Sequence, residues 1–179
     1  MLFPGTHGGS FGTIVKMILT SKSPDFFPEA ENFHNECGAY QLQAALRAFG
    51  DTIPNISELY HSEKHRKRDW SLPWNMPKIL SKYGVLSKMG FWVRPSFTPN
   101  LAGHLRADKP SLFVVNSIQG KGDLHWMSAW GFDPSTSEFL VYDSQMPASA
   151  STHGNARYHA NLLEHHLPFL GTFAVTIHG

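Results

Sequence analysis

The chain has 179 residues, about the length of one domain, and its 41% hydrophobic and 16% charged residues argue against intrinsic disorder and a coiled coil. Fifteen Lys and Arg against 14 Asp and Glu leave a net charge of +1, so the chain has no overall charge that would attract nucleic acid or an anionic membrane. A single cysteine excludes an internal disulfide and a thiolate-based zinc or iron–sulfur site, which leaves thiol reactivity as its most informative property.

The first thirty residues are expected to be a partly flexible lead-in to one domain that spans residues 1–179. The segment from Pro4 to Gly12 is rich in glycine, but it lacks the Gly-Lys-Ser/Thr ending of a phosphate-binding loop. The apolar segment from Ile14 to Leu19 is too short to span a membrane and lacks the order of a secretory signal. We therefore expect a protein with no membrane partner that is cytoplasmic, or exported by a route without a cleavable signal peptide.

Two helices are predicted in the first half of the chain. After Asn35, apolar residues recur at three- and four-residue steps, as on one face of a helix: Ala39, Leu42, Ala45, Leu46 and Phe49. Asn35 is the predicted capping residue, because its side-chain oxygen can accept a hydrogen bond from an unpaired amide, and Gly50 ends the helix. Cys37 then lies in the first turn. A second helix is predicted from Met76 to Tyr83.

The second half of the chain is predicted to be rich in β-structure. The predicted strands are residues 112–115, 125–132, 139–142 and 172–177. A turn-forming segment at 133–137 predicts an antiparallel hairpin between the second and third of these strands. A short helix is also expected between Asn155 and His166.

The register of this hairpin decides which side chains share a face. A five-residue loop places Phe132 opposite Glu138 and, further along, Met127 opposite Asp143. His125 then lies on the same face as Asp143, at a diagonal distance that a carboxylate and an imidazole can bridge. Gln145 shares that face and is the reserve candidate for the same role.

Cys37, His125 and Asp143 together have the chemistry of nucleophilic catalysis. The unpaired amides and the dipole at the start of a helix favour a thiolate, which is the reactive form of cysteine. A thiolate nucleophile also needs a base within hydrogen-bonding reach and a third group that orients that base. The structural alternatives are a buried inert thiol, a core histidine and an aspartate that ends a strand.

Several short segments resemble the papain-like cysteine peptidase superfamily, nearest the bacteriocin-processing, double-glycine-leader peptidase-like family. They are Asn35-Glu36-Cys37-Gly38, Lys109-Pro110 before an apolar strand, Leu124-His125-Trp126, Gly131-Phe132-Asp133 and Val141-Tyr142-Asp143. The resemblance covers roughly residues 31–145, and the order cysteine, histidine, aspartate is the order of the family.

The resemblance implies an α+β, papain-like fold. An N-terminal helical lobe, with the nucleophile at a helix N-terminus, would pack on an antiparallel β-sheet or half-barrel, and the site would lie between the lobes. It also implies the roles of the site residues: Cys37 as nucleophile, His125 as general base and acid, and Asp143 as orienting carboxylate. The expected function is a cysteine-dependent amide-bond hydrolase, a thiol protease, that acts on a protein or peptide through a thioester.

One position departs from the family pattern. The family has a glutamine about six residues before the cysteine that helps to hold the oxyanion, but this chain has Glu31, whose charge would repel the developing anion. Asn32 or Asn35, with the backbone amide of Cys37, are the candidate replacements. The departure keeps open a catalytically degenerate member that binds peptide. A second alternative is a deamidase or acyltransferase effector, because the same thioester chemistry serves those reactions.

Two charged clusters also have a simpler interpretation. The basic run from Lys64 to Arg68 is interpreted as a solvated loop rather than a nucleic-acid contact. His153, His159, His165 and His166 lack the spacing that places metal ligands side by side on a helix. We therefore expect no nucleic-acid partner, no metal and no cofactor, and the sequence leaves the oligomeric state open.

Overall fold

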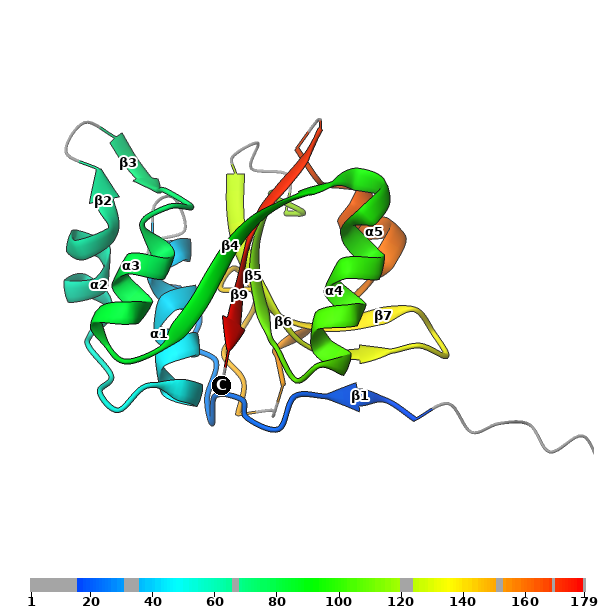
Figure 1. Cartoon of the computed structure of the whole chain (residues 1–179), viewed down its shortest axis with the longest axis horizontal. Coiled ribbons are helices and arrows are strands. Elements are labelled where there is room, and N and C mark those ends of the chain that lie inside the picture. The colour runs from blue at the N-terminus through cyan, green and yellow to red at the C-terminus, as the bar shows by residue number, and fades with distance from the viewer. Residues whose placement is uncertain are drawn as a thin grey trace, which may run out of the picture.

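The computed structural model describes residues 16–30, 36–65, 68–119, 124–150, 153–168 and 170–178. Its helices are α1 (Cys37–Phe49), α2 (Ile56–Glu63), α3 (Met76–Lys82), the short 3-10 helix η1 (Arg94–Ser96), α4 (Phe97–Arg106) and α5 (Ala160–His165). Its strands are β1 (Ile18–Leu19), β2 (Lys64–His65), β3 (Arg68–Ser71), β4 (Leu86–Val93), β5 (Ser111–Asn116), β6 (Leu124–Asp133), β7 (Glu138–Tyr142), β8 (Ala156–His159) and β9 (Gly171–His178). Helices α1 to α3 form a lobe beside an antiparallel sheet, and α4 and α5 lie on the other side of it (Figure 1), so the α+β class is confirmed.

Helix α1 packs on the sheet with the face that the three- and four-residue spacing predicts. Leu42 and Leu46 are fully buried in an apolar cluster shared with α2, α3, β5, β6 and β9. Burial of each such side chain contributes about 1.5–3 kcal/mol, so this packing fixes the helix against the sheet. Gly50 follows the helix as predicted, and its N–H donates to the carbonyl of Leu46 at 2.8 Å.

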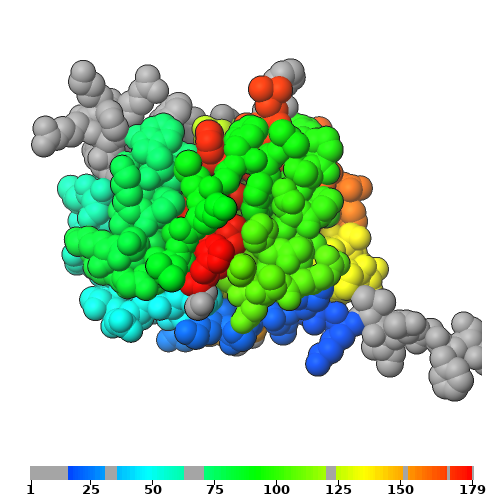
Figure 2. Space-filling view, viewed as in Figure 1, coloured from blue at the N-terminus to red at the C-terminus, as the bar shows by residue number. Residues whose placement is uncertain are grey.

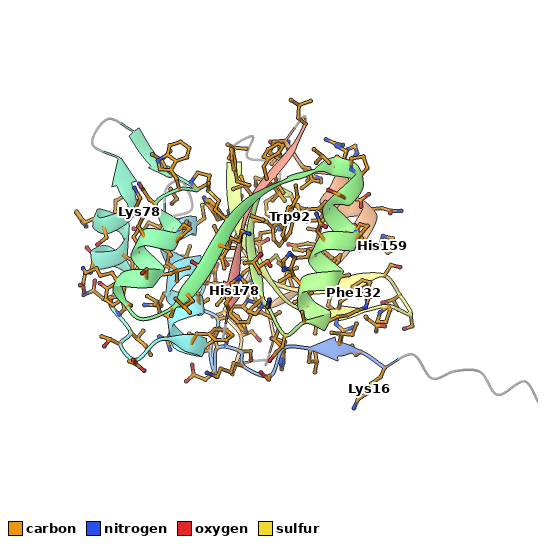
Figure 3. The ribbon with its side chains drawn as sticks, in the orientation of Figure 1. Lys16, Lys78, Trp92, Phe132, His159 and His178 are labelled. Carbon is orange, nitrogen blue, oxygen red and sulfur yellow. The ribbon has the colours of Figure 1, made fainter. Side chains whose placement is uncertain are left out.

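The main sheet has seven strands in the order β4-β9-β5-β6-β7-β8, with β1 paired to the end of β6. Helices cover both faces of its centre, and alternate residues of β6 therefore enter different cores: Trp126 faces α1, while Met127 and Ala129 face α4. At the outer strand β4, Trp92 points toward α4 and stacks on His104 at a ring distance of 5.2 Å (Figure 3). In the space-filling view, parts of β9 are visible between β4 and α4 (Figure 2).

The β6–β7 hairpin differs from its predicted register at the loop but matches it near the site. Asp133 pairs with Glu138 and Phe132 pairs with Phe139, so the loop has one residue fewer than predicted and the Phe132–Glu138 pair is wrong. A β-bulge between Ala129 and Gly131 then inserts one extra residue on β6. Beyond the bulge, Ser128 pairs with Tyr142. The next pair in that register is Met127 with Asp143, as the sequence predicted.

The short helix expected between Asn155 and His166 is confirmed as α5, and the residues before it form a strand that was not predicted. Gly154 has φ +139°, and a Cβ there would lie 2.5 Å from the carbonyl oxygen of Val141, so the position requires glycine. The turn directs residues 156–159 back along β7 as strand β8, and helix α5 begins only at Ala160.

Other elements were also not predicted from the sequence, and the longest of them are α2, α4 and β4. Helix α2 has a weak apolar face, in which Leu59 is the fully buried residue. Helix α4 contains Pro99 and Gly103, which usually disfavour helices, but Pro99 lies in the first turn, where its missing N–H costs no intrahelical hydrogen bond. Strand β4 was missed because most of its apolar residues are exposed on an outer strand and do not alternate with polar ones; only Trp92 among them is buried.

The described part of the lead-in, residues 16–30, packs on the domain. β1 pairs with β6, and Phe27 is fully buried beside Trp130 and Tyr142. The segment from Pro4 to Gly12 lies outside the described residues. No helix in the described ranges combines the length and apolar character needed to cross a bilayer.

Candidate active site

Cys37 is the first residue of α1 and is partly exposed. Amides in the first turn of a helix have no partner within the helix, so the thiol lies beside the positive end of the helix dipole. Glu36, and not the predicted Asn35, occupies the capping position, and its side chain makes no capping hydrogen bond. Asn35 itself lies outside the described residues.

His125 lies near the start of β6, at the sheet end that faces Cys37. Its Nε2 is 2.8 Å from Oδ1 of Asp143, and the two residues are 1% and 0% exposed. With Nε2 directed to Asp143, Nδ1 is the nitrogen available to the thiol of Cys37, which lies close enough to the imidazole to raise its pKa. The structure thus brings together the three residues that the sequence singled out.

The protonation of His125 depends on its two partners. Burial lowers the pKa of the imidazole, but the hydrogen bonds to Asp143 and Cys37 and the charges of both groups outweigh it and raise the pKa of His125 to about 9. The site therefore favours an imidazolium near neutral pH. An imidazolium beside a thiol is the arrangement that supports a thiolate.

The carboxylate of Asp143 is held by three donors, although it has no exposure to solvent. Oδ1 accepts from Nε2 of His125 and from the backbone N–H of Gln145 at 2.9 Å, and Oδ2 accepts from the hydroxyl of Tyr158 at 2.7 Å. Burial raises the pKa of Asp143, but the hydrogen bonds and the charge of His125 prevail and lower it below its usual value. Asp143 is therefore kept ionised in the interior.

Asn155 fixes the backbone at Asp143. Its Oδ1 accepts from the N–H of Asp143 at 2.9 Å, and its Nδ2 donates to the carbonyl of the same residue at 2.9 Å. Asp143 follows the last residue of β7, and the Asn155 side chain takes the place there of a neighbouring strand as the hydrogen-bond partner of the backbone. Neither Asn155 nor Tyr158 was identified from the sequence, because both contacts depend on the unpredicted strand β8 and the turn that precedes it.

Of the other predicted site residues, Gln145 is the one that lies within the described ranges. The side chain of Gln145 accepts from the hydroxyl of Ser117 at 3.0 Å, so this residue supports Asp143 through its backbone and does not take its place. Glu31 and Asn32, which concern the oxyanion, lie outside the described residues.

Two polar links join the helical lobe to the sheet around the site. Trp126, next to His125, donates its indole N–H to the carbonyl of Ser71 at 3.1 Å. Ser128 donates to Oε1 of Gln41 at 2.6 Å, and Gln41 lies one turn after Cys37 on α1. These links fix the distance between the helix that carries the thiol and the strand that carries the imidazole.

The histidines near the C-terminus have local structural contacts. His159 caps α5 by accepting from the N–H of Asn161 at 3.2 Å, and the rings of His165 and His166 meet edge to face at 5.5 Å. Among the described residues, no group of three or more His, Cys, Asp or Glu is placed to hold a metal ion. Arg66 and Lys67 of the basic run lie outside those residues.

Two solved structures are similar to this chain in fold. A double glycine motif protease from an AMS/PCAT transporter, in complex with the leader peptide, has a TM-score of 0.58 at 15% identity, over 89% of this chain and 94% of that chain. UfSP from C. elegans has a TM-score of 0.59 at 12% identity, over 94% of this chain and 35% of that chain. No family model and no curated protein match the sequence. The similarity confirms the papain-like fold that the resemblance predicted, and the chemistry must be argued from the residues.

Proposed function

We propose that this chain is a cysteine peptidase in which Cys37, His125 and Asp143 hydrolyse an amide bond through a thioester. One observation carries the proposal: the thiol at the first residue of α1 lies beside an imidazole that a buried carboxylate holds from its other side. The papain-like fold supports it, because a double glycine motif protease has a similar fold.

The chemical steps follow from this arrangement. The proton of Cys37 moves to His125, and the thiolate electron pair forms a bond to the amide carbonyl carbon. His125 then gives its proton to the leaving nitrogen as the C–N bond breaks, which leaves a thioester on Cys37 and releases an amine. Neutral His125 next takes a proton from water, whose oxygen forms a bond to the thioester carbon. The C–S bond then breaks, which releases the acid and restores the Cys37 thiolate beside protonated His125. Asp143 stays ionised throughout and keeps the imidazole oriented.

The developing oxyanion needs hydrogen-bond donors. The backbone N–H of Cys37 is one donor, because it belongs to the unpaired amides of the first helical turn. Asn32 or Asn35 remains the predicted second donor. Loss of one such donor reduces the rate by about 10²–10³-fold in other enzymes, so the replacement of glutamine by Glu31 predicts a slow enzyme rather than a different nucleophile.

The proposed substrate is a protein or peptide. The double glycine motif protease with a similar fold was solved with a leader peptide, which supports a peptide substrate here. The same thioester chemistry would also deamidate glutamine or pass the acyl group to an amine, and the products of these reactions differ in mass.

The test is mass spectrometry of peptide pools incubated with the protein. We expect split peptides from the wild-type chain, none from Cys37→Ala or His125→Ala, and unchanged cleavage from His104→Ala, which alters a histidine that stacks on Trp92 instead. A gain of about one dalton without a split would identify a deamidase, and joined peptides an acyltransferase. If no product forms and Cys37 is unreactive, the proposed chemistry is refuted, and the alternative of a peptide-binding member remains.

A further inference from the structure

Asp143 is a buried carboxylate whose two oxygens have different partners. Oδ1 faces His125 and the N–H of Gln145, whereas the described partner of Oδ2 is the hydroxyl of Tyr158 at 2.7 Å. Solvent does not reach this carboxylate, because Asp143 is 0% exposed. A buried ionised oxygen without a hydrogen-bond donor costs free energy. Because water does not reach Oδ2, the Tyr158 hydroxyl supplies the donor.

We propose that Tyr158 is a positioning residue of the candidate peptidase site, whose hydroxyl holds Oδ2 of Asp143 so that Oδ1 remains directed at Nε2 of His125. The inference rests on the proposed function and adds a fourth side chain to it. Tyr158 lies in β8, next to β7, and touches neither Cys37 nor a reacting atom in the proposed mechanism. Its effect on the imidazole passes through Asp143.

The direction of the Tyr158 hydroxyl is set by the charge of its partner. An ionised carboxylate oxygen only accepts hydrogen bonds, so the tyrosine O–H is the donor to Oδ2 of Asp143. Burial and the charge of Asp143 raise the pKa of Tyr158 well above its usual value, so the hydroxyl keeps its proton at every pH at which an enzyme is assayed.

The surroundings of Asp143 define which groups a pH measurement would report. The titratable groups that act on it are His125 on β6, Tyr158 on β8 and, beside it on β7, Tyr142. Both tyrosines keep their protons, because burial raises the pKa of each. Acid titration in this cluster therefore reports Asp143 coupled to His125 and, through His125, to Cys37.

The first experiment is Tyr158→Phe, which removes the hydroxyl and keeps the ring. We expect kcat/KM for a cleaved peptide to fall about 10-fold at neutral pH, the size expected for losing a hydrogen bond to a charged group. The acid limb of its pH profile should move up by about one pH unit, because removing a donor from the ionised form raises the pKa of a carboxyl. In an Asp143→Asn background, Tyr158→Phe should have no further effect on the rate.

Tyr142→Phe is the matched control. Tyr142 is also a buried tyrosine, but its hydroxyl donates to the carbonyl of Pro28 at 2.8 Å instead of to Asp143. We expect this variant to lose similar stability and to keep the wild-type pH profile. If both variants lower the rate equally with unchanged profiles, Tyr158 acts only through stability and the inference is wrong.

A second measurement does not depend on peptidase activity. The carboxyl carbon of Asp143 can be followed by ¹³C NMR from neutral pH downward, with Asp143→Asn to assign the signal. Asp143 should begin to take up a proton at a higher pH in Tyr158→Phe than in the wild-type chain, whether or not a peptide is cleaved. Curves that coincide, or shift the other way, would overturn the inference, whereas loss of the proposed function alone would leave this shift intact.

Discussion

Cys37 and the His125–Asp143 pair lie in contact but in different environments. The thiol is partly exposed at the start of a helix, while the imidazole and the carboxylate are buried and held by hydrogen bonds. The carboxylate has three donors, and Asn155 fixes its backbone. The difference suits the proposed chemistry, in which the nucleophile must reach a substrate but the orienting group must not move or meet water.

Removal of the buried charge is expected to have the largest effect. Asp143→Asn keeps the shape of the side chain but removes the charge that stabilises the imidazolium, so we expect kcat to fall by about 10⁴-fold, as for an equivalent change in serine proteases. Steady-state kinetics on a cleaved peptide would measure it. A fall of less than about 10-fold would mean that Asp143 does not orient His125.

The buried pair also predicts how stability depends on pH. The pKa of His125 is raised from 6.5 to about 9, so its imidazolium stabilises the fold fully below pH 6.5, and this contribution is lost as the pH rises through about 9. Urea unfolding should therefore show the free energy of unfolding falling by on the order of 3 kcal/mol over this range. His125→Gln should flatten the dependence, whereas His104→Gln should retain it. A wild-type stability that does not change over this range would contradict the raised pKa.

The backbone clamp at Asp143 is expected to have a smaller effect. Asn155→Ala leaves the N–H and the carbonyl of Asp143 without their side-chain partner, so we expect a loss of about 1–3 kcal/mol in stability and about 10-fold in kcat. Asn100→Ala, which removes a hydrogen bond to Ser96 on the far side of the sheet, is the control and should change stability only slightly. Equal effects of the two variants on kcat would argue against a role for the clamp.

The smallest effect is expected at Gln145. Its side chain contacts Ser117, and its contribution to Asp143 comes from the backbone N–H, which Gln145→Ala retains. We expect kcat/KM to change by less than about 3-fold, the scale of one hydrogen bond between neutral groups. A loss approaching that of Asp143→Asn would instead make Gln145 the third member of the site.

The sequence correctly predicted that His125 and Asp143 lie on the same face of the hairpin, but the register behind that prediction was only partly right. His125 and Asp143 share a face because a loop shorter by one residue and a bulge of one residue compensate each other. Loop length and bulges depend on packing across the sheet, here including Gly131, where a Cβ would lie 2.8 Å from the Leu140 side chain. The alternation of apolar and polar residues predicts neither the length of the loop nor the bulge.

Long, periodic elements were predictable, whereas supporting contacts were not. The face of α1 and the strands β5, β6 and β9 follow from apolar spacing alone. Tyr158 and Asn155 reach Asp143 only because Gly154 turns the chain back onto β7, a pairing between segments with no local pattern in common. Support for a buried charge is therefore found in the tertiary structure and not in a motif.

The most direct test of the central claim is the rate at which iodoacetamide alkylates Cys37 near pH 6, measured by intact mass in the wild-type chain and in His125→Ala. The account predicts rapid labelling of the wild-type thiol, because the imidazolium beside it supports a thiolate, and labelling at least about 10-fold slower in the variant. Equal rates in the two proteins, or a native thiol that does not react, would contradict the claim that His125 activates Cys37.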